Sequence, residues 1–222
     1  MSCMKCNQLI DFLEKRRQEI YKDERSILKE YDELLMKYGI VRGYDGVTYK
    51  KKIKRKAKNN KSLINEIVSL YQKAQLQNEK ETLLDDLFEA GYGQDKLIQL
   101  IIDAFKKSNG EENLWQYGDL LYRMKNYDYM DEYEKIAKET KYASARQMVV
   151  ALIGESKKEA EIPFLISLLE DEEIEGHVIW ALSNYRKSEV YEIMQKYTDH
   201  PRKWIRDIAI KYVVKYEKTI RL

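Results

Sequence analysis

The segment IEGHVIWALSNY, residues 174–185, decides the expected fold because it belongs to a repeating pattern. Three other segments share its length and its placement of apolar residues: NLWQYGDLLYRM (113–124), SARQMVVALIGE (144–155) and WIRDIAIKYVVK (204–215). The period is about 31 residues, which is enough for two short antiparallel helices and two turns. The pattern therefore predicts that these segments are the second helices of stacked two-helix units.

Aligning the four segments gives three apolar columns, with one glycine among them. The columns are Leu121, Leu152, Leu182 and Val213; Tyr117, Met148, Val178 and Ala209; and Gly118, Val149, Ile179 and Ile210. Columns of this kind face the core of a stack in which each unit contacts its neighbours. A glycine within a helix costs roughly 1 kcal/mol relative to alanine. We therefore expect close packing at Gly118 to compensate for this cost.

The longer segment EIPFLISLLEDEEIEGHVIWALSNY, residues 161–185, resembles the short HEAT-like repeats found in many bacterial proteins. The resemblance covers about residues 94–217. The residues that carry it are Trp115, Arg146, Gly176, His177, Trp204 and Arg206. It implies an all-α fold, an α-α superhelix of stacked helical hairpins with an N-terminal helical region. The function that such repeats imply is binding, without a particular reaction or partner.

The composition agrees with a helical protein. Only 2 prolines and 9 glycines occur among 222 residues, which favours long helices over sheet. The 40 basic and 38 acidic residues nearly cancel, so the net charge of +2 makes no global case for nucleic acid. No apolar run reaches the roughly 20 residues of a membrane span, and the first residues lack the order of a signal peptide. We therefore expect a cytoplasmic protein without membrane association.

Residues 1–61 are expected to form an N-terminal domain, followed by an α-solenoid over 62–222 whose repeats are clearest over 94–217. Seven-residue spacing of apolar side chains predicts one long helix or a helical hairpin over residues 7–38. The residues with this spacing are Leu13, Ile20, Ile27 and Leu34. The segment GIVRGYDGVTY, residues 39–49, contains three glycines and is expected to be a loop that could hold a short hairpin.

The segment KKKIKRKAKNNK, residues 50–61, has eight basic residues and no acidic one. It can be interpreted as a solvated helix start or linker, or as a phosphate-binding segment. Ile53 and Ala57 give it one narrow apolar edge, which suits a helix lying on a surface. Phosphate contacts would be electrostatic and would not read a base sequence. The candidate phosphate contacts are Lys50, Lys51, Lys52, Lys54, Arg55, Lys56 and Lys58.

Two columns of mixed polarity flank the apolar ones and are expected to line the concave face of the superhelix. Two tryptophans, an arginine and several amide or acidic groups have the composition of a binding surface. The predicted binding residues are Trp115, Gln116, Asp119, Arg146, Gln147, His177, Trp180, Asp207 and Lys211. Alternatively, the tryptophans lean onto the neighbouring repeat and extend the core. Arg206 is expected to pair with a carboxylate between repeats, such as Asp171 or Asp199, rather than with a ligand.

No nucleophile with a neighbouring base, phosphate loop or metal cluster appears in the sequence, so no catalytic residue, metal site or cofactor is predicted. Cys3 and Cys6 form a lone CxxC and are expected to be two ordinary thiols. The leading hypothesis is a non-catalytic scaffold that holds a protein or peptide partner on the concave face. Another hypothesis is a nucleic-acid binder that uses the lysine-rich segment, residues 50–61.

The enzyme hypothesis follows from a second resemblance. HEAT-repeat alkylpurine DNA glycosylases line a concave groove with Trp, Asp, Arg and Trp, and the segment IWALSNYRKSE, residues 179–189, is similar to part of that family. The corresponding residues here would be Trp115, Asp119, Arg146 and Trp180. The resemblance implies that Asp119 would stabilise the cationic sugar as the glycosidic bond breaks.

Overall fold

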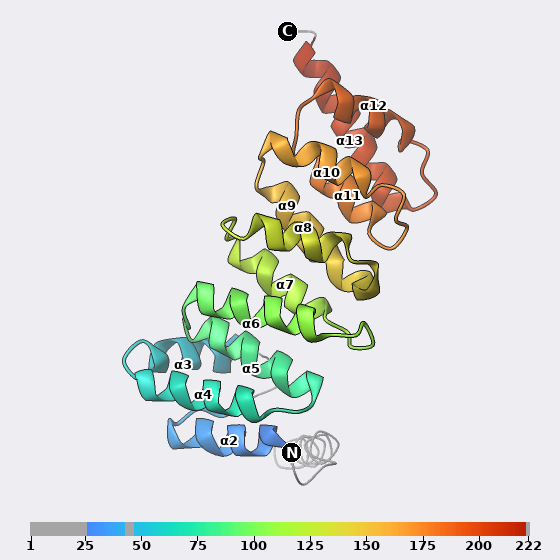
Figure 1. Ribbon diagram of the computed structural model, residues 1–222. Coiled ribbons are helices and arrows are strands. Elements are labelled where there is room, and N and C mark those ends of the chain that lie inside the picture. The colour runs from blue at the N-terminus through green and yellow to red at the C-terminus, as the bar shows by residue number, and fades with distance from the viewer. Residues whose placement is uncertain (1–25, 43–46, 221–222) are drawn as a thin grey trace, which may run out of the picture. The chain divides into compact units, whose positions relative to one another are not determined.

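The computed structural model describes residues 26–42 and 47–220, and over these residues the chain is all-helical (Figure 1). They form twelve α-helices and two short 3-10 helices, and no strand occurs among them. The prediction of an all-α protein is therefore confirmed. None of the described helices is long and apolar enough to cross a membrane. The predictions for Cys3, Cys6, Leu13 and Ile20 lie outside the described residues.

Contacts divide the chain into two units, the first ending at Gly93 and the second beginning at Gln94. The first unit contains the helices α2 (Ile27–Lys37), α3 (Val47–Ala57), α4 (Lys61–Lys73) and α5 (Gln77–Glu89). Helix α4 contacts α2, α3 and α5, and α3 also contacts α5. The helices α4 and α5, which the sequence pattern assigned to the repeats, thus pack with the N-terminal helices α2 and α3.

Two buried carboxylates of α5 hold α2 in place. The Glu79 carboxylate accepts hydrogen bonds from the Ser26 hydroxyl and from the Ile27 backbone N–H, both at 3.0 Å. The Tyr31 hydroxyl donates to Oδ2 of Asp86 at 2.8 Å. Buried polar groups are costly unless they are hydrogen-bonded. These bonds therefore favour one position of α2 along α5 over others.

The second unit contains the four repeated segments. Its α-helices are α6 (Gln94–Lys107), α7 (Trp115–Met124), α8 (Met130–Lys138), α9 (Gln147–Glu155), α10 (Ile162–Ser167), α11 (Glu175–Leu182), α12 (Ser188–Lys196) and α13 (Lys203–Ile220). The 3-10 helices Thr140–Arg146 and Glu159–Glu161 precede α9 and α10. Helix α7 contacts α9, α9 contacts α11, and α11 contacts α13 (Figure 1). Helices α8, α10 and α12 pack on α9, α11 and α13 respectively.

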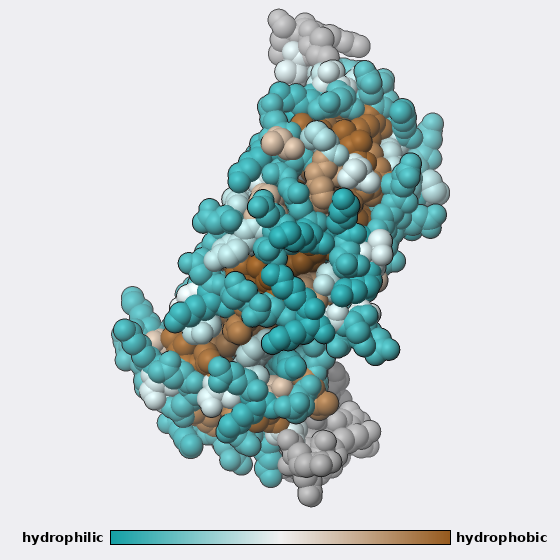
Figure 2. Space-filling model, viewed as in Figure 1, coloured by the Kyte–Doolittle hydropathy of each residue, from teal (hydrophilic) through white to brown (hydrophobic). Residues whose placement is uncertain are grey.

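Most residues of the apolar columns lie in the core of the second unit. Among the exceptions are Met148 of α9, which is half-buried, and Ile210 of α13, which is 43% exposed, whereas Ala209 of α13 is completely buried as predicted. Leu121, Leu152 and Leu182 are completely buried. On α13, Val213 is half-buried, whereas Tyr212 is only 7% exposed. The predicted register of this helix is therefore wrong by one residue, and Tyr212 continues the column of leucines. In the view of Figure 2, hydrophilic side chains cover most of the surface and apolar ones appear between them.

Gly118 and Gly154 lie where neighbouring backbone approaches closely. A Cβ atom on Gly118 would lie 2.5 Å from the carbonyl oxygen of Ala145. A Cβ atom on Gly154 would lie 2.5 Å from Cα of Ala181. Real Cβ atoms do not approach other atoms this closely. The expected close packing at Gly118 is therefore confirmed, and the neighbour is the backbone just before α9.

A pair of carboxyl groups beside α10 is expected to make stability depend on pH. Glu161 is 7% exposed, and burial, together with its hydrogen bond to Glu134, raises the pKa of its carboxyl from 4.5 to about 7. Between pH 4.5 and about 7, the Glu161 carboxyl keeps its proton in the native state but has lost it in the unfolded chain. The free energy of unfolding therefore falls as the pH rises. We expect Glu161→Gln to be more stable than wild type by more than about 1 kcal/mol at pH 8. The two proteins should differ little at pH 4.5.

Urea denaturation at pH 4.5 and pH 8 measures this difference. Glu192→Gln, at an exposed position on α12, is the matched control and should differ little from wild type at either pH. An advantage of Glu161→Gln that is the same at both pH values would contradict the raised pKa of Glu161.

Candidate binding groove

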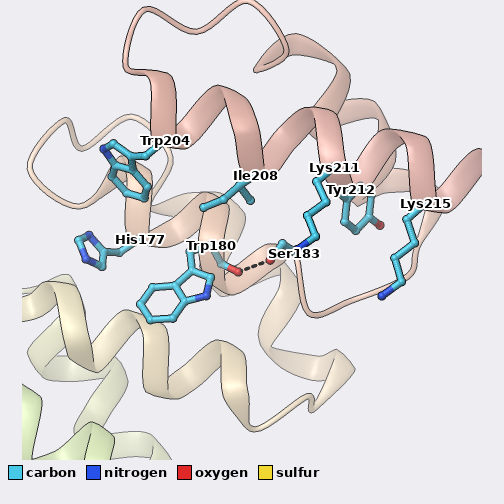
Figure 3. Close-up of a pocket in the computed structure, with 8 residues that line it drawn as sticks. All are labelled: His177, Trp180, Ser183, Trp204, Ile208, Lys211, Tyr212 and Lys215. Carbon is cyan, nitrogen blue, oxygen red and sulfur yellow. Dashed lines mark hydrogen bonds between the residues drawn. The ribbon is translucent and has the colours of Figure 1, made fainter.

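An open pocket of about 650 Å³ lies between α11 and α13 (Figure 3). The residues that line it are His177, Trp180, Ser183, Trp204, Ile208, Lys211, Tyr212 and Lys215. Trp204, Ile208, Lys211 and Lys215 are spaced by three or four residues, so they share one side of α13. The eleven helical steps from Trp204 to Lys215 correspond to roughly 16 Å. An extended peptide of about five residues has the same length.

Aromatic rings line one end of this groove. The His177 ring lies 5.6 Å from the Trp204 ring in an edge-on arrangement and 6.0 Å from the Trp180 ring. Trp180 in turn lies 5.8 Å from Tyr122 of α7. Burial lowers the pKa of His177 below its ordinary value of 6.5, so the ring is neutral at pH 7. Trp204 is 44% exposed, which leaves a large apolar surface available to a ligand.

The indole of Trp204 lies against Gly176, the second residue of α11. A Cβ atom at Gly176 would overlap two carbons of the six-membered ring of Trp204 and would come within 3.0 Å of Ile205. The missing side chain therefore provides the space that the indole occupies. Gly176 thus sets the position of one wall of the groove without lining it.

The opposite end of the groove is cationic. Lys211 and Lys215 lie one helical turn apart on α13 (Figure 3), and none of the described residues lining the groove is acidic. A second pocket of about 240 Å³ shares three lining residues with the groove and adds Lys157 and Arg186. The two pockets together carry four cations, which creates a positive potential next to the aromatic end.

Three of the predicted binding residues, His177, Trp180 and Lys211, line this groove. The other six do not. Trp115, Gln116 and Asp207 are exposed, Asp119 and Gln147 are half-buried, and Arg146 is buried. The Asp119 carboxylate lies 3.9 Å from Arg123 on the same helix, and Gln147 Nε2 donates to the carbonyl oxygen of Glu173 at 2.9 Å.

Arg146 was predicted to line the binding surface, and the structure places it in the interior instead, at 1% exposure. Its Nη1 lies 2.6 Å from Oδ2 of Asp171 and also donates to the carbonyl oxygen of Ala137 at 3.2 Å. Its Nε donates to the carbonyl oxygen of Ala143 at 3.1 Å. These partners compensate for removing the guanidinium from water. The four residues that the DNA-glycosylase resemblance implies therefore do not share one surface.

Arg206 has a different partner from the one expected. Asp171 is paired with Arg146, and Nη1 of Arg206 donates to the backbone carbonyl oxygen of His200 at 2.6 Å. Arg206 therefore has a structural partner, as expected. The partner is a backbone carbonyl of the loop before α13 and not a carboxylate of a neighbouring repeat.

Sequence reasoning missed Trp204, Ile208 and Lys215 as groove residues. Trp204 and Ile208 lie one turn apart, beside the buried pair Ile205 and Ala209. An apolar pair at this spacing next to a core stripe indicates a second apolar face on the same helix. This spacing is present in the sequence. It was not recognised because the predicted register of α13 was wrong by one residue.

The predicted phosphate contacts lie in the first unit, on α3 and, for Lys58, in the turn that follows it. Lys50 forms an ion pair with Asp85 of α5. The remaining six are exposed: Lys51, Lys52, Lys54, Arg55, Lys56 and Lys58. Within residues 26–42 and 47–220, no group of three or more His, Cys, Asp and Glu side chains is arranged to hold a metal ion.

Comparison of the chain with protein-family models, curated proteins and solved structures found no match.

Proposed function

We propose that the second unit is a HEAT-like binding module whose groove between α11 and α13 holds a short extended segment of a partner protein. The observation that carries the proposal is the division of one groove into an aromatic end and a cationic end (Figure 3). The segment that fits has an aromatic or large aliphatic side chain near Trp180 and Trp204. Acidic residues that follow it within about five positions reach Lys211 and Lys215.

The contacts between helices support the HEAT-like part of this proposal. Each repeated segment contacts the next, in the order α7, α9, α11 and α13. Each of α8, α10 and α12 packs on the repeated helix that follows it. Nearest-neighbour packing of two-helix units is the defining property of such arrays.

The energetics of the groove favour a peptide ligand. Tryptophan is enriched among the residues that contribute most to protein interfaces, because it buries a large rigid surface. The lysines add electrostatic attraction to acidic residues, which increases the association rate and selects partners by charge. The aromatic end thus supplies most of the affinity, and the cationic end supplies selectivity.

The polar groups of the groove support binding over catalysis. The Ser183 hydroxyl donates to the carbonyl oxygen of Trp180 at 2.6 Å, and the Tyr212 hydroxyl donates to the carbonyl oxygen of Tyr185 at 2.7 Å. The nearest rings to His177 are the two tryptophans. Nucleophilic catalysis needs a hydroxyl or thiol within hydrogen-bond reach of a base, and these two hydroxyls are bound to backbone carbonyls instead.

Selection of a random ten-residue peptide library on the full chain tests the proposal. We expect enrichment of peptides in which an aromatic or large aliphatic residue precedes two or more acidic residues. The affinity of a synthetic enriched peptide is then measured by fluorescence polarisation. Trp204→Ala should weaken binding about 10- to 30-fold. Lys211→Glu with Lys215→Glu should reverse the charge preference of the selected peptides.

Trp115→Ala is the matched control, because Trp115 is exposed on α7 at a similar fraction, 39%, and does not line the groove. It should bind the peptide as wild type does. Circular dichroism verifies that each variant is folded. Enriched peptides without acidic residues, or equal losses from Trp115→Ala and Trp204→Ala, would show that the groove is not the binding site.

A further inference from the structure

Helix α3 presents a broad cationic surface to solvent. Tyr49, Ile53 and Ala57, spaced by four residues, are buried and hold the helix against α4 and α5. The outward positions of α3 and the first residue after it carry six exposed cations: Lys51, Lys52, Lys54, Arg55, Lys56 and Lys58. At about 100° per residue, these six side chains spread over roughly half of the helix circumference, opposite the buried stripe.

The described residues of the first unit do not neutralise these six charges. Lys50, at the edge of the buried stripe, is the member of the basic segment that pairs with α5, through Asp85. None of the six exposed cations forms an ion pair with a carboxylate in the part of the chain that the structure describes. Residues 47–61 also contain no acidic residue. The outward face of α3 therefore has a concentrated positive charge although the whole chain has a net charge of only +2.

We propose that the outward face of α3 binds the phosphate backbone of double-stranded nucleic acid, independently of the peptide groove. Lysine and arginine side chains that neutralise phosphates release condensed counterions, which drives association without reading sequence. An α-helix fits the width of the major groove of a DNA duplex. Nearly every outward side chain on α3 is a lysine or arginine, so we expect binding that does not depend on base sequence.

The burial pattern of α3 favours a duplex over two other polyanionic partners. Proteins that hold single strands stack bases on exposed aromatic rings, and the aromatic residue of α3, Tyr49, is 8% exposed. A helix that lies on a membrane inserts an apolar face between lipids. The apolar face of α3, formed by Ile53 with Tyr49 and Ala57, is already packed against the protein.

Fluorescence anisotropy with a labelled 20-base-pair DNA duplex and an RNA duplex of equal length tests this proposal on the full chain. We expect the logarithm of affinity to fall with the logarithm of NaCl concentration with a slope of about −3 or steeper. This slope corresponds to a loss of about 60-fold or more between 50 and 200 mM NaCl. Lys51→Gln, Arg55→Gln and Lys58→Gln, made together, should reduce the slope by about 2.7 and the affinity at 50 mM by at least about 10-fold.

The matched control removes three cations from the second unit, by Lys157→Gln, Lys211→Gln and Lys215→Gln made together. It has the same net charge as the α3 variant and should retain the slope and affinity of wild type. If circular dichroism shows that the α3 triple variant is unfolded, single Lys51→Gln and Arg55→Gln variants should each reduce the slope by about 0.9. Glutamine, lysine and arginine have similar helix propensities, so each substitution changes the helix propensity of α3 little.

Three results would overturn the proposal. The first is an unchanged slope in the α3 variant. The second is an equal loss in the control, which would place the duplex at the peptide groove or reduce the effect to net charge. The third is binding of α3 to vesicles containing 30% phosphatidylserine, or to polyglutamate, at a salt concentration at which neither duplex binds. That result would assign the cationic surface to a membrane or to an acidic protein.

Discussion

Replacing Arg146 with methionine is expected to lower the free energy of unfolding by about 3 to 5 kcal/mol. The substitution keeps most of the side-chain volume but removes the partner of the Asp171 carboxylate, which is 24% exposed. It also removes the donor to the carbonyl oxygens of Ala137 and Ala143. Buried groups that lose their partner keep the full cost of desolvation. Urea denaturation followed by circular dichroism measures the loss.

Arg202→Met is the matched control for Arg146→Met. Arg202 is exposed, and its Nη1 donates to the carbonyl oxygen of Glu172 at 3.4 Å, so its replacement should cost about 0.5 kcal/mol or less. Combining Arg146→Met with Asp171→Asn should recover part of the loss, because the unpaired charge is gone. A loss below about 1 kcal/mol from Arg146→Met would show that Arg146 is not a buried structural residue.

Truncating Leu152 to alanine is expected to cost about 2 to 5 kcal/mol. Leu152 is completely buried in α9, the helix that contacts both α7 and α11. Its truncation leaves a cavity that the neighbouring helices cannot close without moving. Thermal and urea denaturation both report the loss.

Asp119→Asn provides the contrasting measurement. The Asp119 side chain is 30% exposed and lies 3.9 Å from Arg123, so this substitution should cost less than about 1 kcal/mol. If instead Asp119→Asn costs as much as Leu152→Ala, Asp119 is a buried structural partner. A small loss from Leu152→Ala would mean that α9 is not at the centre of the core.

Periodicity predicted most of the core because burial of an apolar stripe recurs at each turn of a helix. It placed Leu121, Leu152 and Leu182 correctly. It failed at α13, where Tyr212 and Val213 are adjacent and both have apolar surface. The Tyr212 hydroxyl donates to the carbonyl oxygen of Tyr185 at 2.7 Å, and this bond holds Tyr212 inward. Hydrophobicity alone contains no information about such a bond.

The position of Arg146 could not be predicted for a related reason. Its place in the repeat indicated a position next to the core, just before α9 begins, but not whether the guanidinium points to solvent or inward. The inward position requires Asp171, 25 residues further along the chain, and two backbone carbonyls in suitable positions. Only the tertiary structure brings these acceptors together. His177, Trp180 and Lys211 could be predicted as binding residues because they lie on the exposed face of two repeated helices, α11 and α13.

The contact between Trp204 and Gly176 means that the shape of the groove depends on a residue that a ligand does not touch. The indole occupies the space that a side chain at position 176 would fill. One methyl group at position 176 would displace the ring and alter the width of the aromatic end while every lining residue stayed the same. The selectivity of the groove can therefore change through a substitution at Gly176, which supports one wall, as well as through a substitution of a residue that lines the groove. In an engineered version, position 176 offers a way to adjust which side chain is accepted while leaving the four cations in place.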